Sequence, residues 1–297
     1  MRIVLVTTSY PAHEGDPSGH FVRAEARELE RQGHEVVVVS PRAGGAFGWP
    51  GFAARVREKP WRLLDAMRWT TRAARRLAVT EADRIVAHWA VPCAWPVAAV
   101  SSGTHRTELA VVSHGADVRL LVGLPAMIRE RIVGSIARRA TEWRFVSAAL
   151  RAQLVESLGA ARALVERIAT VRAPSIELPS VGDRIARIAR ELDGKRVAVS
   201  VGRLVASKRV DRAIRHVARN RDVDGLVVVG DGPERARLEE LARRCDVDTR
   251  FVGLVPREEA LAWIGAARMV LHGSQHEGLS TVVREAEALG TPVVNPR

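Results

Sequence analysis

Residues 197–214 read VAVSVGRLVASKRVDRAI, and this segment indicates the fold class. Its first part, Val197–Val201, is a short apolar run rich in β-branched residues, which is typical of a strand buried on both faces. Gly202 ends the run, and a helical pattern of apolar positions follows it. A buried strand, a glycine turn and a helix in succession predict one unit of a parallel α/β sheet.

The same alternation extends from this segment in both directions. Similar apolar runs predict strands over residues 2–6, 35–40, 84–87, 109–113, 144–146, 226–229, 249–252, 269–272 and 292–294. Helical patterns separate the runs, and the clearest covers Phe21–Gln32, with Gly33 as its C-terminal cap. The sequence therefore predicts doubly wound α/β sheets, in which ligands bind beyond the carboxyl ends of the strands.

The segment 173–194 separates the predicted strands into two groups. It contains Pro174, Pro179 and Gly182 and shows no strand pattern, so we expect it to connect two domains. We predict an N-terminal Rossmann-like domain over residues 1–175 and a C-terminal one over residues 176–297, facing each other across a cleft. A chain of 297 residues is long enough for a core in each.

The composition is that of a reduced, globular chain. Cys93 and Cys245 match no metal-ligand or redox spacing, and the opening MRIVLVTTSYP predicts a strand rather than a signal peptide. The most apolar later run, Ile85–Val100, is interrupted by a histidine and two prolines and is shorter than the roughly 18–20 residues of a membrane span. We therefore expect a cytoplasmic protein.

The net charge of +12 has two interpretations. It could attract anionic lipid, phosphorylated substrates or nucleic acid, or it could reflect an arginine-rich coding background. The sequence shows no nucleic-acid recognition motif, and aromatic residues for base stacking make up 4% of the chain. We therefore expect no nucleic-acid partner.

Two cations follow the strand Val197–Val201. Arg203 and Lys208 come after Gly202, near the start of a helix, where backbone N–H groups favour anions. Arginine can bind a diphosphate through two parallel hydrogen bonds, and lysine adds a point charge. The alternative is that both side chains are solvated surface cations. The Gly-Lys-Ser/Thr ending of a phosphate-binding P-loop is absent.

A pair of carboxylates follows the predicted strand 269–272. Residues 276–294 read HEGLSTVVREAEALGTPVV, in which Glu277 precedes a helix and Glu285 lies one turn inside it. Both side chains can point toward the ligand-binding edge of the sheet. The backbone N–H groups available to a phosphate there belong to Gly278, Leu279 and Ser280. The alternative is that Glu285 is an exposed glutamate like Glu287.

Together these motifs resemble the GT-B glycosyltransferases of family 4. In the second half the resemblance rests on Gly202-Arg203-Leu204 with Lys208, Gly230-Asp231-Gly232-Pro233, Phe251-Val252-Gly253, and the pair Glu277 and Glu285. In the first half it rests on SYP at 9–11, GHFV at 19–22, AHWAVP at 87–92 and SHGAD at 113–117. No single motif is specific, but the joint pattern covers most of the chain.

The resemblance implies a retaining enzyme that moves a sugar from a nucleotide-diphosphate sugar to a hydroxyl acceptor, lipid-linked or a glycan. Arg203 and Lys208 would neutralise the leaving diphosphate. Glu277 would contact the donor sugar, Glu285 the ribose, and His114 the sugar or leaving group from the other domain. The donor site would further include Gly19, Gly202, Val255, Gly278, Leu279 and Ser280.

The resemblance also implies that no metal and no other cofactor is needed. The departing phosphate would help to deprotonate the acceptor, so the two glutamates are not the acid and nucleophile of a glycosidase. Taken alone, a histidine such as His114 is more often structural, but its place after a strand and before Gly115 and Asp117 favours the functional role. His88, between apolar neighbours and Trp89, fits either a core or a site position.

Two segments depart from the family pattern. Residues 174–177, PSIE, stand where the family has a Gly-Val/Ile-Asp turn, and the sequence stops at Arg297, where the family continues with a further strand and helices. We therefore expect a second domain that is incomplete at its C-terminus. This leaves open a fragment, a shortened active form, or a non-catalytic relative that binds nucleotide sugars or polyanions.

Residues 55–76 add a basic amphipathic segment to the first domain. The segment mixes Trp61, Leu64, Met67 and Trp69 with many arginines. Such a helix could lie peripherally on an anionic membrane surface, close to a lipid-linked acceptor. The alternative is an ordinary surface helix whose tryptophans belong to the core.

Overall fold

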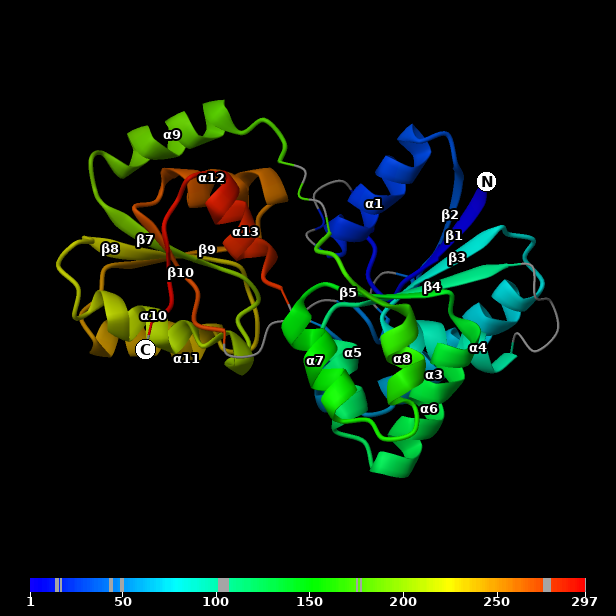
Figure 1. Cartoon of the computed structure of the whole chain (residues 1–297). Coiled ribbons are helices and arrows are strands. Elements are labelled where there is room, and N and C mark those ends of the chain that lie inside the picture. The colour runs from blue at the N-terminus through cyan, green and yellow to red at the C-terminus, as the bar shows by residue number, and fades with distance from the viewer. Residues whose placement is uncertain are drawn as a thin grey trace. The chain divides into compact units, whose positions relative to one another are not determined.

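The computed structural model describes residues 1–13, 16, 18–42, 45–48, 51–100, 107–174, 176, 178–274 and 279–296. The chain forms two compact units, one made of residues 1–12 and 18–175 and the other of residues 13–17 and 176–297. Each unit is a parallel sheet with helices on both faces (Figure 1). This architecture confirms the prediction of two Rossmann-like domains.

The first unit contains six described strands in the order β2-β1-β3-β4-β5-β6. The strands are β1 (Arg2–Val6), β2 (Glu35–Val39), β3 (Arg84–His88), β4 (Glu108–Ser113), β5 (Glu142–Phe145) and β6 (Ala169–Val171). The helices are α1 (His20–Arg31), α2 (Phe52–Glu58), α3 (Arg62–Ala78), the irregular turn η1 (Ala90–Ala94), α4 (Trp95–Val100), α5 (Ala116–Val122), α6 (Ala126–Arg139), α7 (Ala148–Glu156) and α8 (Arg162–Ile168). Helix α1 covers one face of this sheet, and α3, α6 and α8 lie on the other (Figure 1).

The second unit contains five described strands in the order β11-β10-β7-β8-β9. The strands are β7 (Val197–Val201), β8 (Gly225–Val229), β9 (Thr249–Gly253), β10 (Met269–Leu271) and β11 (Val293–Val294). The helices are α9 (Gly182–Leu192), the short turn η2 (Ala206–Lys208), α10 (Val210–Val217), α11 (Arg235–Arg244), α12 (Arg257–Ala266) and α13 (Thr281–Ala288).

Two apolar layers hold the second sheet, because successive side chains of a strand point to opposite faces. Val197 and Val199 of β7 pack with α9, α12 and α13, whereas Ala198 packs with α10 and α11. The same division is visible in Figure 1, where α9, α12 and α13 lie above the sheet and α10 and α11 below it. Burial on both faces explains the continuous apolar runs of the sequence.

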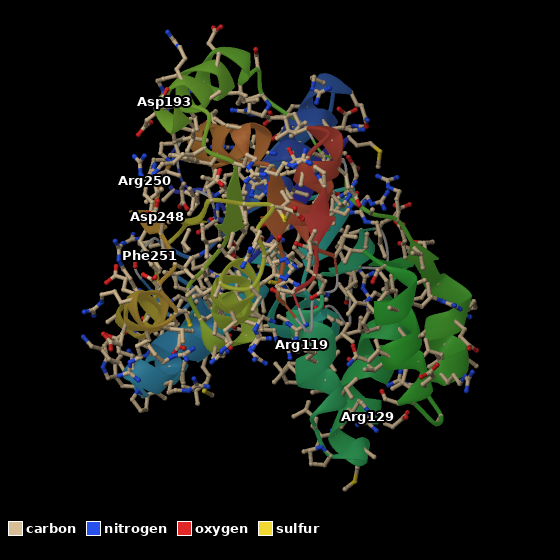
Figure 2. The ribbon with its side chains drawn as sticks, turned by 90° about the vertical axis from the view of Figure 1, so that its left-hand side faces the viewer. Arg119, Arg129, Asp193, Asp248, Arg250 and Phe251 are labelled. Carbon is tan, nitrogen blue, oxygen red and sulfur yellow. The ribbon has the colours of Figure 1, made fainter. Side chains whose placement is uncertain are left out.

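Strand β9 is an edge strand of this sheet, and charged residues flank its exposed side. Arg250 pairs with Glu191 at 2.5 Å, and Lys195 pairs with Asp248 at 3.2 Å. Figure 2 shows Arg250, Asp248 and Phe251 close together on this side of the second unit. Charges at an edge strand oppose pairing with another chain.

Each sheet has one point at which the strand order reverses. In the first unit β2 and β3 lie on opposite sides of β1, and in the second β8 and β10 lie on opposite sides of β7. Helices on the two sides of such a point diverge and leave a crevice beyond the carboxyl ends of the strands, where ligands bind. We therefore expect ligand-binding sites at the carboxyl ends of β1 and β3 and of β7 and β10.

The structure differs from the sequence-based expectations in three details. Helix α9 occupies part of the connection predicted over 173–194, and β6 was not predicted. The basic segment 55–76 is not one helix: α2 ends at Glu58 and α3 begins at Arg62. Pro60 lies between them, and a proline lacks the backbone N–H and disfavours helical geometry at the preceding residue.

Within the described ranges, no helix is both long and apolar enough to cross a bilayer.

Candidate functional site

Two loops at the carboxyl edge of the second sheet are joined through their backbones. The Gly202 amide donates to the Val229 carbonyl oxygen at 2.9 Å, and the Leu204 amide donates to that of Asp231 at 2.9 Å. Gly230 lies so close to this loop that a Cβ atom there would be 1.9 Å from the Gly202 carbonyl oxygen. The loop that carries Arg203 is therefore held against its neighbour.

The predicted cations lie beside the reversal point between β7 and β10. Arg203 is half-buried, and burial lowers its pKa. Lys208 ends the turn η2, and a Cβ atom on Gly273, just beyond β10, would be 3.3 Å from the Lys208 carbonyl oxygen. Burial, and then the Lys208 charge, lower the pKa of His272 to about 4, so this histidine is neutral near neutral pH. The site therefore owes its positive charge to arginine and lysine.

Glu285 differs sharply from its neighbour Glu287. It is 6% exposed, whereas Glu287 lies on the exposed side of the same helix, α13. The Arg257 Nε and NH2 groups, from the start of α12, both donate to Glu285 Oε1, at 3.0 and 2.8 Å. The alternative that Glu285 is one exposed glutamate among several is therefore wrong.

The remaining donor-site predictions of this unit fall on the loops around α12 and α13. Val255 is half-buried and packs against the core layer beneath α12. Leu279 and Ser280 are half-buried, and the Ser280 hydroxyl accepts a hydrogen bond from the Val283 amide at 3.5 Å as the cap of α13. Glu277 and Gly278 lie outside the described residues, so their assigned roles stay predictions.

In the first unit Gly19 lies where the backbone of the first loop passes closely. It has φ 65°, and a Cβ atom there would be 2.2 Å from the Ser9 carbonyl oxygen. Only glycine fits this contact without displacing the loop after β1. Gly19 therefore fixes the entry into α1 at the reversal point of the first sheet.

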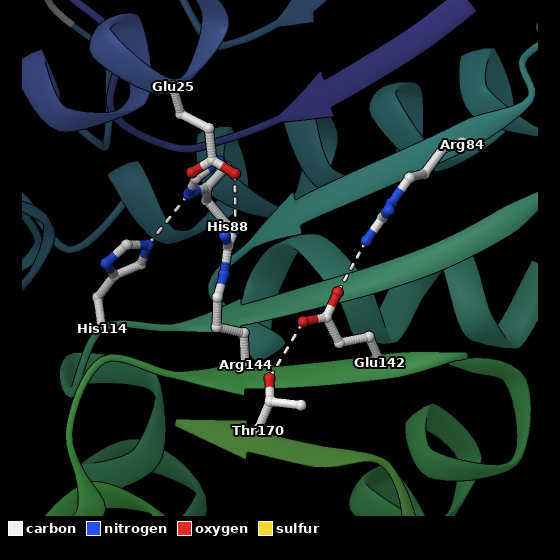
Figure 3. Close-up of polar contacts among 7 residues, drawn as sticks. All are labelled: Glu25, Arg84, His88, His114, Glu142, Arg144 and Thr170. Carbon is white, nitrogen blue, oxygen red and sulfur yellow. Dashed lines mark hydrogen bonds and ion pairs between the residues drawn. The ribbon is translucent and has the colours of Figure 1, made fainter. Parts of the chain in front are cut away.

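His88 and His114 lie side by side at the same edge. Their ring planes are 15° apart and their centroids 5.3 Å apart, so the rings meet edge to edge, with His88 Nδ1 3.0 Å from His114 Nε2 (Figure 3). His88 Nε2 faces Glu25 Oε2 at 3.7 Å. Burial, and then the charge of Arg144, lower the pKa of His88 to about 3. Burial, and then His88, lower the pKa of His114 well below its ordinary value. Both rings are neutral near neutral pH.

Asp117 holds the loops that carry the two histidines. Its Oδ2 accepts the Ala90 amide at 2.8 Å, and its Oδ1 accepts the amides of His114 at 3.2 Å and Gly115 at 3.0 Å. A buried carboxylate with three backbone donors is fully engaged in positioning. Asp117 therefore joins the loop after β3 to the loop after β4.

Several residues of these sites were missed by sequence reasoning. They are Glu25, Arg144, Arg257 and His272. A signal existed only for His272, which ends a predicted strand at the ligand-binding edge. Among the described residues, no three His, Cys, Asp or Glu side chains form a group that could hold a metal ion.

Comparisons with known proteins give two family matches. A family described as Glycosyltransferase Family 4 matches residues 18–171, which is more than half of the chain. A family described as Glycosyl transferases group 1 matches residues 183–295. The two matches correspond to the two structural units.

Similar proteins match all or most of the chain. A GDP-mannose-dependent alpha-mannosyltransferase of Mycolicibacterium smegmatis is 25% identical over 100% of this chain and 80% of its own length. A 2-deoxystreptamine glucosyltransferase of Streptomyces kanamyceticus is 31% identical over 71% of this chain and 59% of its own length.

Solved structures share the fold at low sequence identity. Anabaena HepE in complex with UDP-glucose matches with a TM-score of 0.67 and 18% identity, over 99% of this chain and 80% of its own. The sucrose-phosphate synthase of Thermosynechococcus elongatus matches with a TM-score of 0.68 and 18% identity, over the same shares of the two chains.

Proposed function

The chain belongs to glycosyltransferase family 4, and on that premise we propose that it transfers a sugar from a nucleoside diphosphate donor to a hydroxyl group with retention at the anomeric carbon. One observation carries the proposal. Half-buried Arg203 and Lys208 lie at the carboxyl edge of the second sheet, and the buried carboxylate of Glu285 follows on α13 at the same edge. A diphosphate needs cations and a ribose needs hydrogen-bond acceptors, and this edge supplies both.

In the proposed reaction the bond between the anomeric carbon and the diphosphate oxygen breaks as the acceptor oxygen bonds to the same face of the sugar. The acceptor proton passes to the departing phosphate. Arg203 and Lys208 would stabilise the negative charge that develops on that phosphate. Burial of Arg203 strengthens the effect, because charges interact more strongly where water is excluded.

The proposal assigns charge neutralisation to the two cations rather than to a divalent metal. The rate is then expected to be unchanged by a chelator, and the product is expected to have the anomeric configuration of the donor, read by NMR of the released glycoside. A rate that fell with chelation and returned with Mg²⁺ would contradict metal independence, and an inverted product would contradict retention.

Glu285 gives the sharpest test of the donor site. Two hydroxyl hydrogen bonds to a charged acceptor are worth a few kcal/mol, so Glu285→Ala should raise the donor KM by about tenfold or more. Glu287→Ala, two positions away on the exposed side of α13, is the matched control and should change little. Nucleotide release would be measured with GDP-mannose and UDP-glucose first, since these donors are named for the relatives. Equal donor KM values in the two variants would contradict the ribose role.

A second candidate property, membrane association, is favoured by the exposed face of α3. Trp61, Leu64 and Met67 are 59%, 57% and 59% exposed, whereas Ala66 and Leu77 of the opposite face are buried. Arg68, Arg72, Arg75 and Arg76 continue the exposed side of the same helix. The alternative that the tryptophans belong to the core is wrong for Trp61. An exposed apolar patch followed by arginines fits an anionic lipid surface, where apolar side chains insert and cations meet phosphates.

Vesicle binding tests this property. The protein is expected to co-sediment with vesicles containing an anionic phospholipid and less with purely zwitterionic vesicles. Trp61→Ser with Leu64→Ser should reduce binding severalfold. Leu120→Ser, which alters a 54% exposed leucine on α5, is the control. Absence of binding to either kind of vesicle would rule the property out.

A further inference from the structure

A polar chain of three side chains from three elements ends at the predicted sugar-contacting residue. Glu25 lies on α1, His88 is the last residue of β3, and His114 follows β4. Glu25 Oε2 lies 3.7 Å from His88 Nε2, and His88 Nδ1 lies 3.0 Å from His114 Nε2. Figure 3 shows the remaining nitrogen of His114, Nδ1, on the side of its ring away from His88.

Neighbouring side chains restrict the positions of Glu25, His88 and His114. His88 is fully buried, and its ring lies edge to edge with that of His114, nearly in the same plane. Arg144 from β5 donates to Glu25 Oε1 at 2.5 Å. His114 also contacts the rings of Phe21 and Trp89, with centroids 4.8 and 4.9 Å away. The charged groups that face the histidines are therefore Glu25 and Arg144, while Asp117 binds the backbone beneath them.

The proton positions follow from this geometry. Each neutral histidine carries a hydrogen on one ring nitrogen and a lone pair on the other. His88 Nε2 has no hydrogen-bond partner among the described residues, and the charged atom that faces it is Glu25 Oε2. The Arg144 guanidinium is bound to the other carboxylate oxygen, Glu25 Oε1. A lone pair facing a carboxylate is repelled, whereas an N–H is attracted. The hydrogen of His88 is thus favoured on Nε2, and its Nδ1 must accept.

The position of the hydrogen on His88 then determines its position on His114. If His88 Nδ1 accepts, His114 Nε2 must donate across the 3.0 Å contact. The hydrogen of His114 is then on Nε2, and its Nδ1 carries a lone pair. A histidine whose tautomer is set by a neighbour presents a defined hydrogen-bonding group at its other nitrogen.

We propose that Glu25 and His88 are positioning residues that fix His114 in the Nε2-protonated tautomer and so present Nδ1 as a hydrogen-bond acceptor. This inference rests on the proposed function where it assigns the ligand: a lone pair selects a sugar hydroxyl, which can donate, over a deoxy or O-methyl group. A sugar that meets His114 therefore carries a free hydroxyl at that position.

The tautomer can be read without any donor, so this test is independent of the proposed function. Long-range ¹H–¹⁵N correlation on histidine-labelled protein should show His114 protonated on Nε2. His88→Phe keeps the ring but removes both nitrogens, and His114 should then become a mixture of tautomers. His88→Asn places an amide near the Nδ1 position and should restore the Nε2-protonated form. An Nδ1-protonated His114 in the wild type would overturn the proposal, as would an unchanged tautomer in His88→Phe.

Glu25→Gln serves as the second variant, since it leaves both rings in place if His88→Phe fails to fold. It removes the charge that orients His88. The His114 spectrum should therefore move toward the mixture of tautomers expected in His88→Phe. An unchanged His114 spectrum in Glu25→Gln would show that the carboxylate does not set the tautomer and would overturn its role.

Kinetics supply the second readout. With a donor that the wild type turns over, His88→Phe should lower kcat by about tenfold or more, because a misplaced contact acts on the reacting geometry. His88→Asn should recover most of this loss, and a merely structural role would not distinguish the two variants. Equal kcat values for them, with equal thermal stability, would overturn the proposal. If no nucleotide sugar is turned over by the wild type, the proposed function fails while the spectra still decide the tautomer.

Discussion

At the scale of single residues, the Arg257–Glu285 pair is the contact on which the donor site depends most. Two of the three guanidinium nitrogens of Arg257 converge on one carboxylate oxygen of Glu285, and the two side chains are 18% and 8% exposed. Arg257→Leu would leave a nearly buried carboxylate without this partner, at a cost of roughly 2–3 kcal/mol of unfolding free energy. A Glu285 side chain that Arg257 no longer holds should raise the donor KM more than it lowers kcat. Urea unfolding measures the loss of stability, and steady-state kinetics measures KM and kcat.

A matched surface pair controls for the loss of an arginine. Arg196 and Asp224 form an ion pair at 2.9 Å in the same unit, but their side chains are 54% and 41% exposed. Solvent screens such a pair, so Arg196→Gln should change neither stability nor donor KM measurably. Similar losses in Arg257→Leu and Arg196→Gln would contradict the special role of the buried pair.

The positions of candidate residues could be predicted where the motif is local in sequence, and their roles stay predictions. Glu285 was singled out by its place one turn inside a helix after a predicted strand, and its burial agrees with a site role rather than a surface one. Glu25 and Arg144 were not predictable, because they meet across 119 positions of sequence. Their contact exists only once α1 is folded over the sheet that contains β5, which no local pattern encodes.

At the scale of elements, two glycines allow opposite predictions. Gly182 begins α9, and a Cβ atom there would meet nothing within 4 Å. Gly182→Ala should raise the unfolding free energy by about 0.5 kcal/mol, because alanine loses less backbone entropy on folding. Gly230 has φ 131°, and its Cβ atom would lie 1.9 Å from the Gly202 carbonyl oxygen. Gly230→Ala should lower the unfolding free energy by roughly 3 kcal/mol or more.

Urea unfolding of the two variants beside the wild type measures both effects. A stabilised Gly230→Ala would contradict the close approach of the two loops, and a strongly destabilised Gly182→Ala would contradict an open helix start. Loss of donor binding is expected in Gly230→Ala, since the displaced loop is the one that carries Arg203.

The elements themselves were predicted well where burial is complete. Strands β1 and β7 coincide with their predicted ranges, because continuous apolar runs leave no ambiguity of boundary. Strand β6 was missed because it has three residues, Ala169–Val171, with none of them fully buried. Helix α9 was missed because Pro174, Pro179 and Gly182 precede or begin it. Its Ile185, Ile188 and Leu192 nevertheless recur at helical spacing and pack into the core.

At the scale of the whole molecule, the sequence predicted two α/β domains because the strand–helix alternation is repeated on both sides of a proline-rich connection. The order of strands within each sheet was not predicted, since hydrophobic periodicity marks a strand but not its neighbours. The order matters for function, because it places the reversal points at β1–β3 and at β7–β10. His88 lies at the first of these points and Lys208 at the second, which ties each candidate site to the topology of its own sheet.

Neutral histidines in both units predict how the molecule responds to acid. Burial, and then Arg144, lower the pKa of His88 to about 3, and burial, and then Lys208, lower that of His272 to about 4. The unfolded chain takes up protons on these groups below its ordinary histidine pKa of about 6.5, whereas the folded chain does so only near the lowered values. Stability is therefore complete above that pH and is lost progressively as the pH falls toward about 3–4.

The buried carboxylates act in a lower range of pH and can be separated from this effect. Hydrogen bonding from Arg209 lowers the pKa of Asp211 below its ordinary value of 3.8, so its contribution is lost only as the pH falls below that value. Between about pH 6.5 and about pH 4.5 the histidines dominate, and each can add up to about 1.4 kcal/mol per pH unit to the slope. His88→Asn, compared with the wild type by urea unfolding across this range, should show a shallower slope for the first unit. An identical slope would mean that His88 takes up its proton over the same pH range in the folded and the unfolded chain, which would contradict its lowered pKa.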